Sequence, residues 1–147
     1  MTAANPEGVI RCIHESLTSA GISGNDIDLI SGHLTATIAD KQEIQNWAQA
    51  LGRKGSDFPL TNSLKSMIGH CLSAAGTIES VASVLQIVHG FVHPNINLED
   101  PHPGITELID VNCLPTSLRK KDVNIVAKAN FGFGDVNSCI IFSKYNP

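Results

Sequence analysis

The stretch of sequence that decides the fold reads SAAGTIESVASVLQIV, residues 73–88. Apolar and small side chains occur around most of the helix that this spacing predicts, so little polar face remains. We therefore expect a helix that is buried on nearly all sides. Such a helix needs a covering layer on both sides, and a chain of 147 residues offers few elements to supply the second layer. The chain is therefore expected to be incomplete by itself.

On either side of this helix, strand patterns alternate with helical patterns. The expected helices cover residues 6–20 and 40–51, with Asp40 as an acidic cap and Gly21 and Gly52 as closing residues. The expected strands are 26–30, 58–61, 124–129 and 138–143, with a further strand at 108–111 in the proline-rich, otherwise irregular segment 93–115. The last two long strands flank the glycine-rich turn 130–135. This order indicates an α/β fold with a mixed β-sheet covered by helices.

The composition indicates a globular protein in an aqueous compartment. Ten Lys and Arg residues against fourteen Asp and Glu residues give a formal net charge of −4, which argues against binding to the phosphate backbone of nucleic acids. The longest apolar stretch, residues 81–92, is interrupted by polar residues and is too short to span a bilayer. The start of the chain carries no secretory signal pattern. We therefore expect a cytoplasmic protein of one domain that binds neither nucleic acid nor membrane.

The cysteines and histidines do not form a metal-binding motif. Four cysteines stand at positions 12, 71, 113 and 139, and no two of them have CxxC spacing. Because nothing indicates secretion, reduced thiols are expected rather than disulfides. His89 and His93 have the i, i+4 spacing of helical zinc ligands, but Gly90 lies between them and Pro94 follows. No metal site is therefore expected.

Three polar features stand at the ends of predicted elements, where functional groups often lie. His33 follows the strand 26–30, the segment LKSMIGH at 64–70 leads into the apolar helix, and the turn FGFG at 131–134 joins the last two strands. Each has a purely structural interpretation by itself: a satisfied histidine at a strand end, a solvated lysine, and a tight hairpin with two core aromatic residues. Their order and spacing together are more informative than any one of them.

In this order and spacing the sequence resembles the C-terminal half of the β-ketoacyl-acyl carrier protein synthases, which are condensing enzymes of the thiolase-like superfamily. The family's His-Gly-Thr-x-Thr appears as HLTAT at 33–37, and its Lys-x-x-x-Gly-His, followed by Ala-Ala-Gly and a glutamate, appears as 65–70, 74–76 and Glu79. Its closing Phe-Gly-Phe-Gly-Gly-x-Asn appears as FGFGDVN at 131–137, and residues 1–8 resemble a segment from the middle of such enzymes. Residues 1–147 are therefore expected to form one C-terminal β-ketoacyl synthase domain with a thiolase-like half fold.

The resemblance implies a decarboxylative Claisen condensation of acyl and malonyl thioesters in fatty-acid or polyketide synthesis. His33 and His70 would donate hydrogen bonds to the enolate oxygen that forms when the malonyl thioester loses carbon dioxide. Lys65 would set the charge of the site and the protonation of the imidazoles. Glu79 would support the site, as a buried partner of it or of a bound cation. The substrates would arrive on the phosphopantetheine arm of an acyl carrier protein, and no cofactor is expected.

The resemblance also implies residues for substrate binding. Thr35 and Thr37 would hydrogen-bond the pantetheine arm. Four residues would form a gate for the acyl chain: Phe131, Gly132, Phe133 and Gly134. The ring of Phe133 would swing, and the glycines on either side of it would permit the motion.

The sequence departs from the family pattern at two landmarks. Leu34 replaces the glycine after the first histidine, where it would crowd the pantetheine path or reshape the loop, and Asp135 replaces the last glycine of the turn and adds a charge near the acyl entrance. The family's nucleophilic cysteine lies in an N-terminal half that these 147 residues do not contain. We therefore expect no condensing activity from this chain alone. The N-terminal half of the synthase would be its partner, within a homodimer or a heterodimer.

Three alternatives stay open at this point. Cys71, beside His70 and at a predicted helix start, would be a substitute nucleophile, although it precedes a buried alanine-rich run. A second alternative is a non-catalytic partner that resembles a chain-length factor. Leu34 and Asp135 mildly favour this alternative, whereas the retained residues His33, Lys65 and His70 oppose it. A third possibility is an α/β domain that binds a small molecule without performing chemistry.

Overall fold

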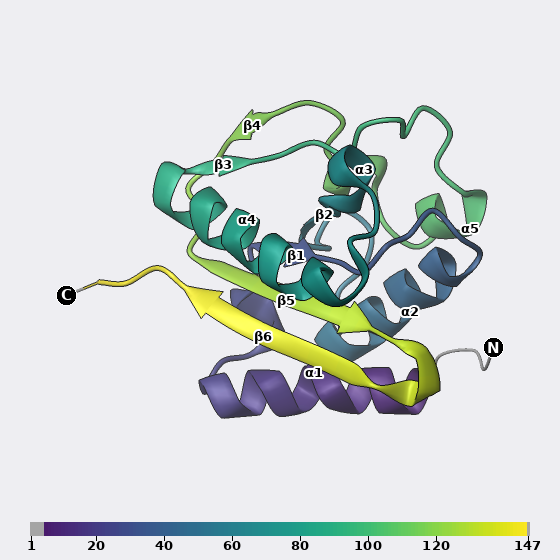
Figure 1. Cartoon of the computed structure of the whole chain (residues 1–147), viewed down its shortest axis with the longest axis horizontal. Coiled ribbons are helices and arrows are strands. Elements are labelled where there is room, and N and C mark those ends of the chain that lie inside the picture. The colour runs from purple at the N-terminus through teal and green to yellow at the C-terminus, as the bar shows by residue number, and fades with distance from the viewer. Residues whose placement is uncertain (1–4, 147) are drawn as a thin grey trace.

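The computed structural model describes residues 5–146, except for the side chain of Phe133. The main elements are α1 (Pro6–Ala20), β1 (Leu29–Ser31), α2 (Ala39–Leu51), β2 (Leu60–Asn62), α4 (Ala75–His89), β5 (Ile125–Phe131) and β6 (Asn137–Ser143). The shorter elements are η1 (Gly24–Asp26), α3 (Lys65–Ile68), η2 (Leu72–Ala74), β3 (Phe91–Val92), α5 (Pro103–Thr106), η3 (Val111–Cys113), β4 (Arg119–Lys120) and η4 (Phe133–Asp135). In Figure 1 the sheet lies between α1 and α2 below it and α4 above it.

The main sheet has four strands in the order β2-β1-β5-β6. β1 pairs in parallel with β2 and with β5, so that Leu29 lies opposite Leu60 on one side and Val126 on the other. β6 returns antiparallel to β5, from the pair Ile125↔Ser143 to the pair Phe131↔Asn137. The predicted mixed sheet with a closing hairpin is thus confirmed. Because β1, β2 and β5 are parallel, their carboxyl ends meet at one edge, and each of the three polar features follows one of these ends.

Local sequence explains how α1 begins and ends. The side chain of Asn5 accepts the backbone N–H of Glu7 at 3.1 Å, and Pro6 occupies the first helical position, where its missing N–H costs nothing. The helix ends at Gly21, whose φ of 67° is left-handed and therefore suits glycine. The predicted span of this helix is confirmed, and its apolar stripe packs toward β6 and α2.

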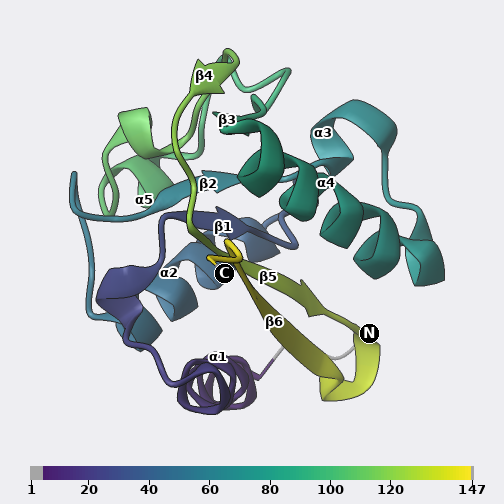
Figure 2. The same ribbon diagram turned by 90° about the vertical axis from the view of Figure 1, so that its left-hand side faces the viewer.

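Two apolar cores hold the layers together, and Figure 2 shows the layers from the side. The larger core joins the sheet to α1 and α2, with Ile13, Ile30 and Trp47 fully buried. The smaller core joins the sheet to α4 and includes Leu29 and Ile87. Burial of apolar side chains on both faces of the sheet is what fixes the parallel strands between the helices.

The central helix, α4, is buried on one face and exposed on the other. Its inward positions include Glu79, Ser83 and Gln86, whereas Val81 and Leu85 point outward and keep 56% and 44% of their surface exposed. The expectation of burial on nearly all sides is therefore wrong for this chain by itself, because no element within residues 5–146 covers the outer face. The helix also begins at Ala75, two residues later than predicted.

Three further predictions about elements need correction. Asp40 does not cap α2, because the helix begins one residue earlier, at Ala39. The strand expected at 108–111 does not form: Ile109 makes one isolated bridge with Gly55, and Asp110 instead caps the 3₁₀ turn η3. The first two strands are shorter or shifted, at 29–31 and 60–62, since residues 24–26 form the 3₁₀ turn η1.

No helix within residues 5–146 is long and apolar enough to cross a bilayer. Over the same range, no three His, Cys, Asp or Glu side chains come together as metal ligands would. The four cysteines are free thiols.

Candidate functional site

His33 is placed by a loop that two carboxylates of α2 hold through its backbone. Glu43 accepts the N–H of His33 at 2.7 Å and the N–H of Leu34 at 2.9 Å. Asp40 accepts the N–H groups of the next two residues, both at 3.0 Å. A Cβ at Gly32 would lie 2.9 Å from a carboxylate oxygen of Glu43, so only glycine lets the loop come this close. The position of His33 is therefore set by main-chain contacts to one helix.

His70 follows the short helix α3 and is oriented by the start of the next turn. Gly69 has a φ of 75°, which lets the chain reverse between α3 and His70. The backbone N–H of Leu72 donates to Nδ1 of His70 at 3.0 Å. A backbone N–H can only donate, so in the neutral ring of His70 the proton is on Nε2. This nitrogen is then a hydrogen-bond donor available to a ligand.

The two imidazoles lie side by side. Their ring centroids are 5.3 Å apart and the planes meet at 79°, while the ring of Phe131 packs 6.5 Å from that of His33. Nδ2 of Asn130 lies 3.4 Å from Nδ1 of His33, which favours a proton on Nε2 of this ring as well. Burial, together with the positive charge of Lys65 and the neighbouring His70, lowers the pKa of His33 to about 4. His33 is therefore neutral at pH 7 and presents a donor.

Beneath the histidines lies a buried group of charges centred on Glu79. One carboxylate oxygen, Oε1, pairs with Nζ of Lys65, and the other, Oε2, lies 2.7 Å from Nζ of Lys128. Nδ2 of Asn130 also donates to Oε2, at 3.1 Å. Burial alone would raise the pKa of Glu79, but the hydrogen bonds and charges of the two lysines outweigh it and lower that pKa. Glu79 therefore stays ionised, and the predicted supporting role fits its position.

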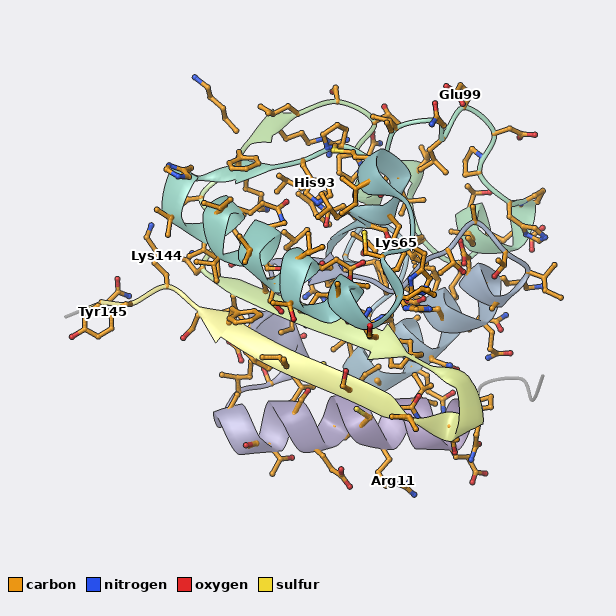
Figure 3. The ribbon with its side chains drawn as sticks, viewed as in Figure 1. Arg11, Lys65, His93, Glu99, Lys144 and Tyr145 are labelled. Atoms are coloured by element: carbon orange, nitrogen blue, oxygen red, sulfur yellow. The ribbon has the colours of Figure 1, made fainter. Side chains whose placement is uncertain are left out.

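A cleft of about 850 Å³ opens beside this group. Thr35, Thr37, Lys65 and His70 line it, together with Leu34. Figure 3 shows Lys65 on the inner side of α3, whereas Arg11 projects away from the molecule. The structure thus brings the predicted threonines, lysine and second histidine to one cavity. A second hollow, of about 580 Å³, lies on the far surface of α1 and contains none of the predicted residues.

The glycine-rich turn begins at the site and leads away from it. Phe131 is buried beside His33, but no described residue of the turn 131–135 lines the cleft. Gly134 has a left-handed φ of 70°. The side chain of Phe133, the expected moving part of the gate, lies outside what the structure describes. Asp135 hydrogen-bonds Asn137 at 2.9 Å, which ties the turn to the start of β6.

Cys71 is poorly placed to act as a nucleophile. Its Sγ lies 4.0 and 3.9 Å from the carbonyl oxygens of Ile68 and Gly69. Carbonyl oxygens accept from a thiol and repel a thiolate. The residue also precedes a 3₁₀ turn of three residues, while α4 begins only at Ala75, so the expected stabilisation by a helix start is absent.

Sequence reasoning missed three residues of this site: Glu43, Lys128 and Asn130. A signal for Lys128 was present, because this lysine follows the apolar residues IVA in a strand run and a buried cation requires an anionic partner. Glu43 precedes the buried Ile44 on α2, and nothing in the local pattern separates it from a solvated helix residue. Asn130 carries no local signal, because its partners Glu79 and His33 come from other parts of the chain.

Comparison with known proteins gives consistent matches across the chain. Residues 1–99 match the family described as beta-ketoacyl synthase, C-terminal domain. The chain is 44% identical over 148 residues to the chloroplastic 3-oxoacyl-[acyl-carrier-protein] synthase II of Arabidopsis thaliana, an alignment that covers 99% of this chain and 26% of that relative. The chain therefore spans about a quarter of the length of this curated relative.

Solved structures of ketosynthases superimpose on the same residues. The ishigamide ketosynthase/chain length factor matches with a TM-score of 0.89 and 35% identity, over 99% of this chain and 34% of that one. A type II PKS acyl carrier protein in complex with its ketosynthase, bound to the hexaketide, matches with a TM-score of 0.79 and 31% identity, over 99% of this chain and 35% of that one. The predicted thiolase-like half fold is thus confirmed.

Proposed function

Since this chain belongs to the family of β-ketoacyl synthase C-terminal domains, we propose that it supplies the two histidines and the lysine of a condensing site. The reaction is the decarboxylative Claisen condensation of an acyl thioester with a malonyl thioester. The nucleophilic cysteine that carries the acyl group comes from residues outside this sequence. We place this reaction in fatty-acid or polyketide synthesis, since the matches named above are a 3-oxoacyl-[acyl-carrier-protein] synthase and the ketosynthase of a type II PKS.

The reaction requires hydrogen-bond donors at the oxygen atom of the enolate that forms from the malonyl thioester. The malonyl group loses carbon dioxide, and the electron pair of the broken carbon–carbon bond becomes an enolate on the thioester. The enolate carbon attacks the acyl carbonyl, a new carbon–carbon bond forms, and the cysteine sulfur leaves as a thiolate. Because negative charge gathers on the enolate oxygen, fixed N–H donors at that position lower the barrier.

The observation that carries this proposal is the pair of adjacent imidazoles whose Nδ1 atoms both face donors. His70 receives the N–H of Leu72, and His33 faces the amide of Asn130. Both Nε2 atoms then carry protons, and the low pKa of His33 keeps that ring neutral. Two neutral rings stabilise an enolate oxygen without protonating it. Lys65 pairs with Glu79, and its positive charge helps to keep the ring of His33 neutral.

The cleft of about 850 Å³ has room for a substrate arm. We assign Thr35 and Thr37, which line it, to hydrogen bonds with the phosphopantetheine of an acyl carrier protein. The solved ketosynthase complex with its acyl carrier protein supports this choice of partner. Leu34 narrows the same cleft, and the turn that starts at Phe131 is assigned to gating of the acyl chain.

The exposed apolar face of α4 is assigned to the remainder of the synthase. Ile78, Val81, Leu85 and Val88 are all more than a third exposed and lie on one helix. Contiguous apolar surface of this kind normally marks an interface. The N-terminal half, whose sheet would form the second layer over α4, is the occupant that we propose, within a homodimeric or heterodimeric enzyme in the cytoplasm, where the free thiols would stay reduced.

The test uses the protein purified from its source with any chain that copurifies. We expect His33→Ala and His70→Ala each to lower the rate of condensation by about 100-fold to 1,000-fold, because each removes one donor to the enolate oxygen. His14→Ala, which changes an exposed histidine on α1, far from the outer face of α4, is the matched control and should leave the rate unchanged.

Two outcomes would contradict the proposal. Full condensing activity after His70→Ala would make the chain a non-catalytic partner subunit. Labelling with a cysteine-directed inhibitor of condensing enzymes should mark a residue outside this sequence, and a label on Cys71 would instead move the nucleophile into this chain.

A further inference from the structure

Lys128 is a lysine in the middle of a sheet strand, and the proposed reaction does not yet use it. It stands fourth among the seven residues of β5, between β1 and β6, with 1% of its surface exposed. A cation in this position is stable only with specific partners. The partners of its Nζ are Oε2 of Glu79 at 2.7 Å and the carbonyl oxygen of Ala129.

The contacts of Glu79 connect Lys128 to His33. Lys65 already pairs with Oε1 of Glu79, so the carboxylate would be neutralised without Lys128. Lys128 instead holds the other oxygen, Oε2, to which Nδ2 of Asn130 also donates. The same Nδ2 atom faces Nδ1 of His33. The orientation of Glu79 therefore determines where the amide that faces His33 can lie.

We propose that Lys128 is a positioning residue for His33, acting through Glu79 and Asn130. This inference rests on the proposed function of His33 as a neutral donor. Lys128 holds Oε2 of Glu79 in place, and this oxygen accepts a hydrogen bond from the side-chain amide of Asn130. The amide in turn faces Nδ1 of His33 and so keeps the proton of this ring on Nε2. The second lysine also leaves the buried group with one more cation than anion, which opposes protonation of the nearby imidazole.

The charged and titratable groups around His33 make the expected direction clear. Lys65 from α3, His70 beyond it and Lys128 from β5 oppose its protonation, whereas Glu79 from α4 favours it. Glu43 of α2 contacts the backbone N–H of His33 rather than the ring. Removal of the Lys128 cation takes away one of the charges that oppose protonation, so it favours imidazolium at His33.

Lys128→Met tests the inference in the purified protein with any copurifying chain. The variant keeps the length of the side chain and leaves Glu79 paired with Lys65, so no buried charge is left alone. We expect the pKa of His33, followed by NMR of isotope-labelled histidine, to rise by about 0.5 to 1 unit. Lys128→Arg keeps the cation and should therefore leave the pKa of His33 close to that of the parent protein. Lys121→Met changes an exposed lysine and should not change the pKa of His33.

A second variant tests the connection itself. Asn130→Ala removes the amide and keeps Lys128, and the pKa of His33 should again rise. In condensation assays the double variant Lys128→Met/Asn130→Ala should lose little more rate than the more severe single variant, because both changes interrupt one chain of contacts.

An unchanged pKa of His33 in folded Lys128→Met would overturn the inference, even if the rate of condensation fell. If Lys128→Met does not fold, an unchanged pKa in Asn130→Ala would overturn it equally. The NMR titration needs no enzymatic turnover. A protein without condensing activity whose His33 still responds to Lys128 would therefore refute the proposed function and leave the positioning role standing.

Discussion

At the scale of single residues, the most informative group is Glu43, a buried carboxylate whose hydrogen-bond donors are two backbone N–H groups. Burial raises the pKa of Glu43 to about 7, although its two backbone hydrogen bonds lower it in part. Both donors belong to the loop that carries His33. Because a backbone N–H is present in any residue except proline, Leu34 replaces the family's glycine without loss of this contact.

Glu43→Gln should therefore destabilise the His33 loop. The amide keeps one acceptor and turns an N–H₂ group toward a backbone N–H, which leaves a buried donor without a partner. We expect a loss of about 1–3 kcal/mol in the free energy of unfolding, measured by urea denaturation at pH 5, where Glu43 is protonated in the folded chain and no cost of a buried charge offsets the loss. Glu107→Gln, at an exposed carboxylate, should change it by less than about 0.5 kcal/mol. Equal stabilities of the two variants would show that Glu43 does not hold the loop.

At the scale of elements, α4 has its polarity reversed. In a surface helix of a globular protein the apolar side chains face the core. Here Glu79, Ser83 and Gln86 are buried toward the sheet, while Val81 and Leu85 face outward. The inner polar groups serve the charge cluster and the buried network, in which Gln86 accepts from Asn62 at 2.8 Å. The outer apolar groups need a cover that residues 5–146 do not supply.

Val81→Asp should disrupt the outer apolar face of α4 and leave its inner polar face intact. The substitution places a charge on the outer face of α4 without a change to its buried side, so we expect the chain to fold as before but to lose its association with the copurifying part of the synthase. Analytical ultracentrifugation and near-UV circular dichroism measure the two effects. Val111→Asp, at a similarly exposed valine on η3, should leave association intact. Association that survives Val81→Asp would place the partner on another face.

At the scale of the whole molecule, buried titratable groups make stability depend on pH in two opposite directions. Burial lowers the pKa of His93, and burial with neighbouring charges lowers that of His33 to about 4. The unfolded chain then binds more protons than the folded chain below pH of about 6.5, so stability is lost on acidification. Glu43, with its pKa raised to about 7, does the opposite and favours the folded state at lower pH.

Urea denaturation across pH should resolve the two effects. Between pH of about 6.5 and 4.5 the free energy of unfolding should fall, and His93→Gln should make this fall shallower, because the imidazole no longer gains a proton on unfolding. From pH of about 5 to 8 the contribution of Glu43 decreases, and Glu43→Gln should remove that slope. His89→Gln, at an exposed histidine, should leave the profile unchanged. An identical acid slope in His93→Gln and the parent protein would contradict the assignment.

Sequence patterns were sufficient for the elements whose causes are local. The span of α1 follows from a cap, a proline and a closing glycine, and the hairpin follows from two strand-like runs around a glycine-rich turn. The resemblance to the family also singled out His33, Lys65 and His70, and the structure places the two imidazoles next to each other and Lys65 and His70 along one cleft. The prediction failed for residues 108–111, where an isolated bridge and a cap replace a strand.

By itself, then, the sequence determined the α/β class, the span of α1, the closing hairpin and the family that the chain resembles, since periodicity, capping and motif spacing act over a few residues. Only the tertiary structure decided that Lys128 and Asn130, 49 and 51 positions beyond Glu79, share its carboxylate. It also decided that Glu43 holds the backbone at His33 and that α4 turns its polar side inward. The physical reason is that a buried charge is stable only where partners from other strands and helices meet it, and that meeting depends on packing rather than on local sequence.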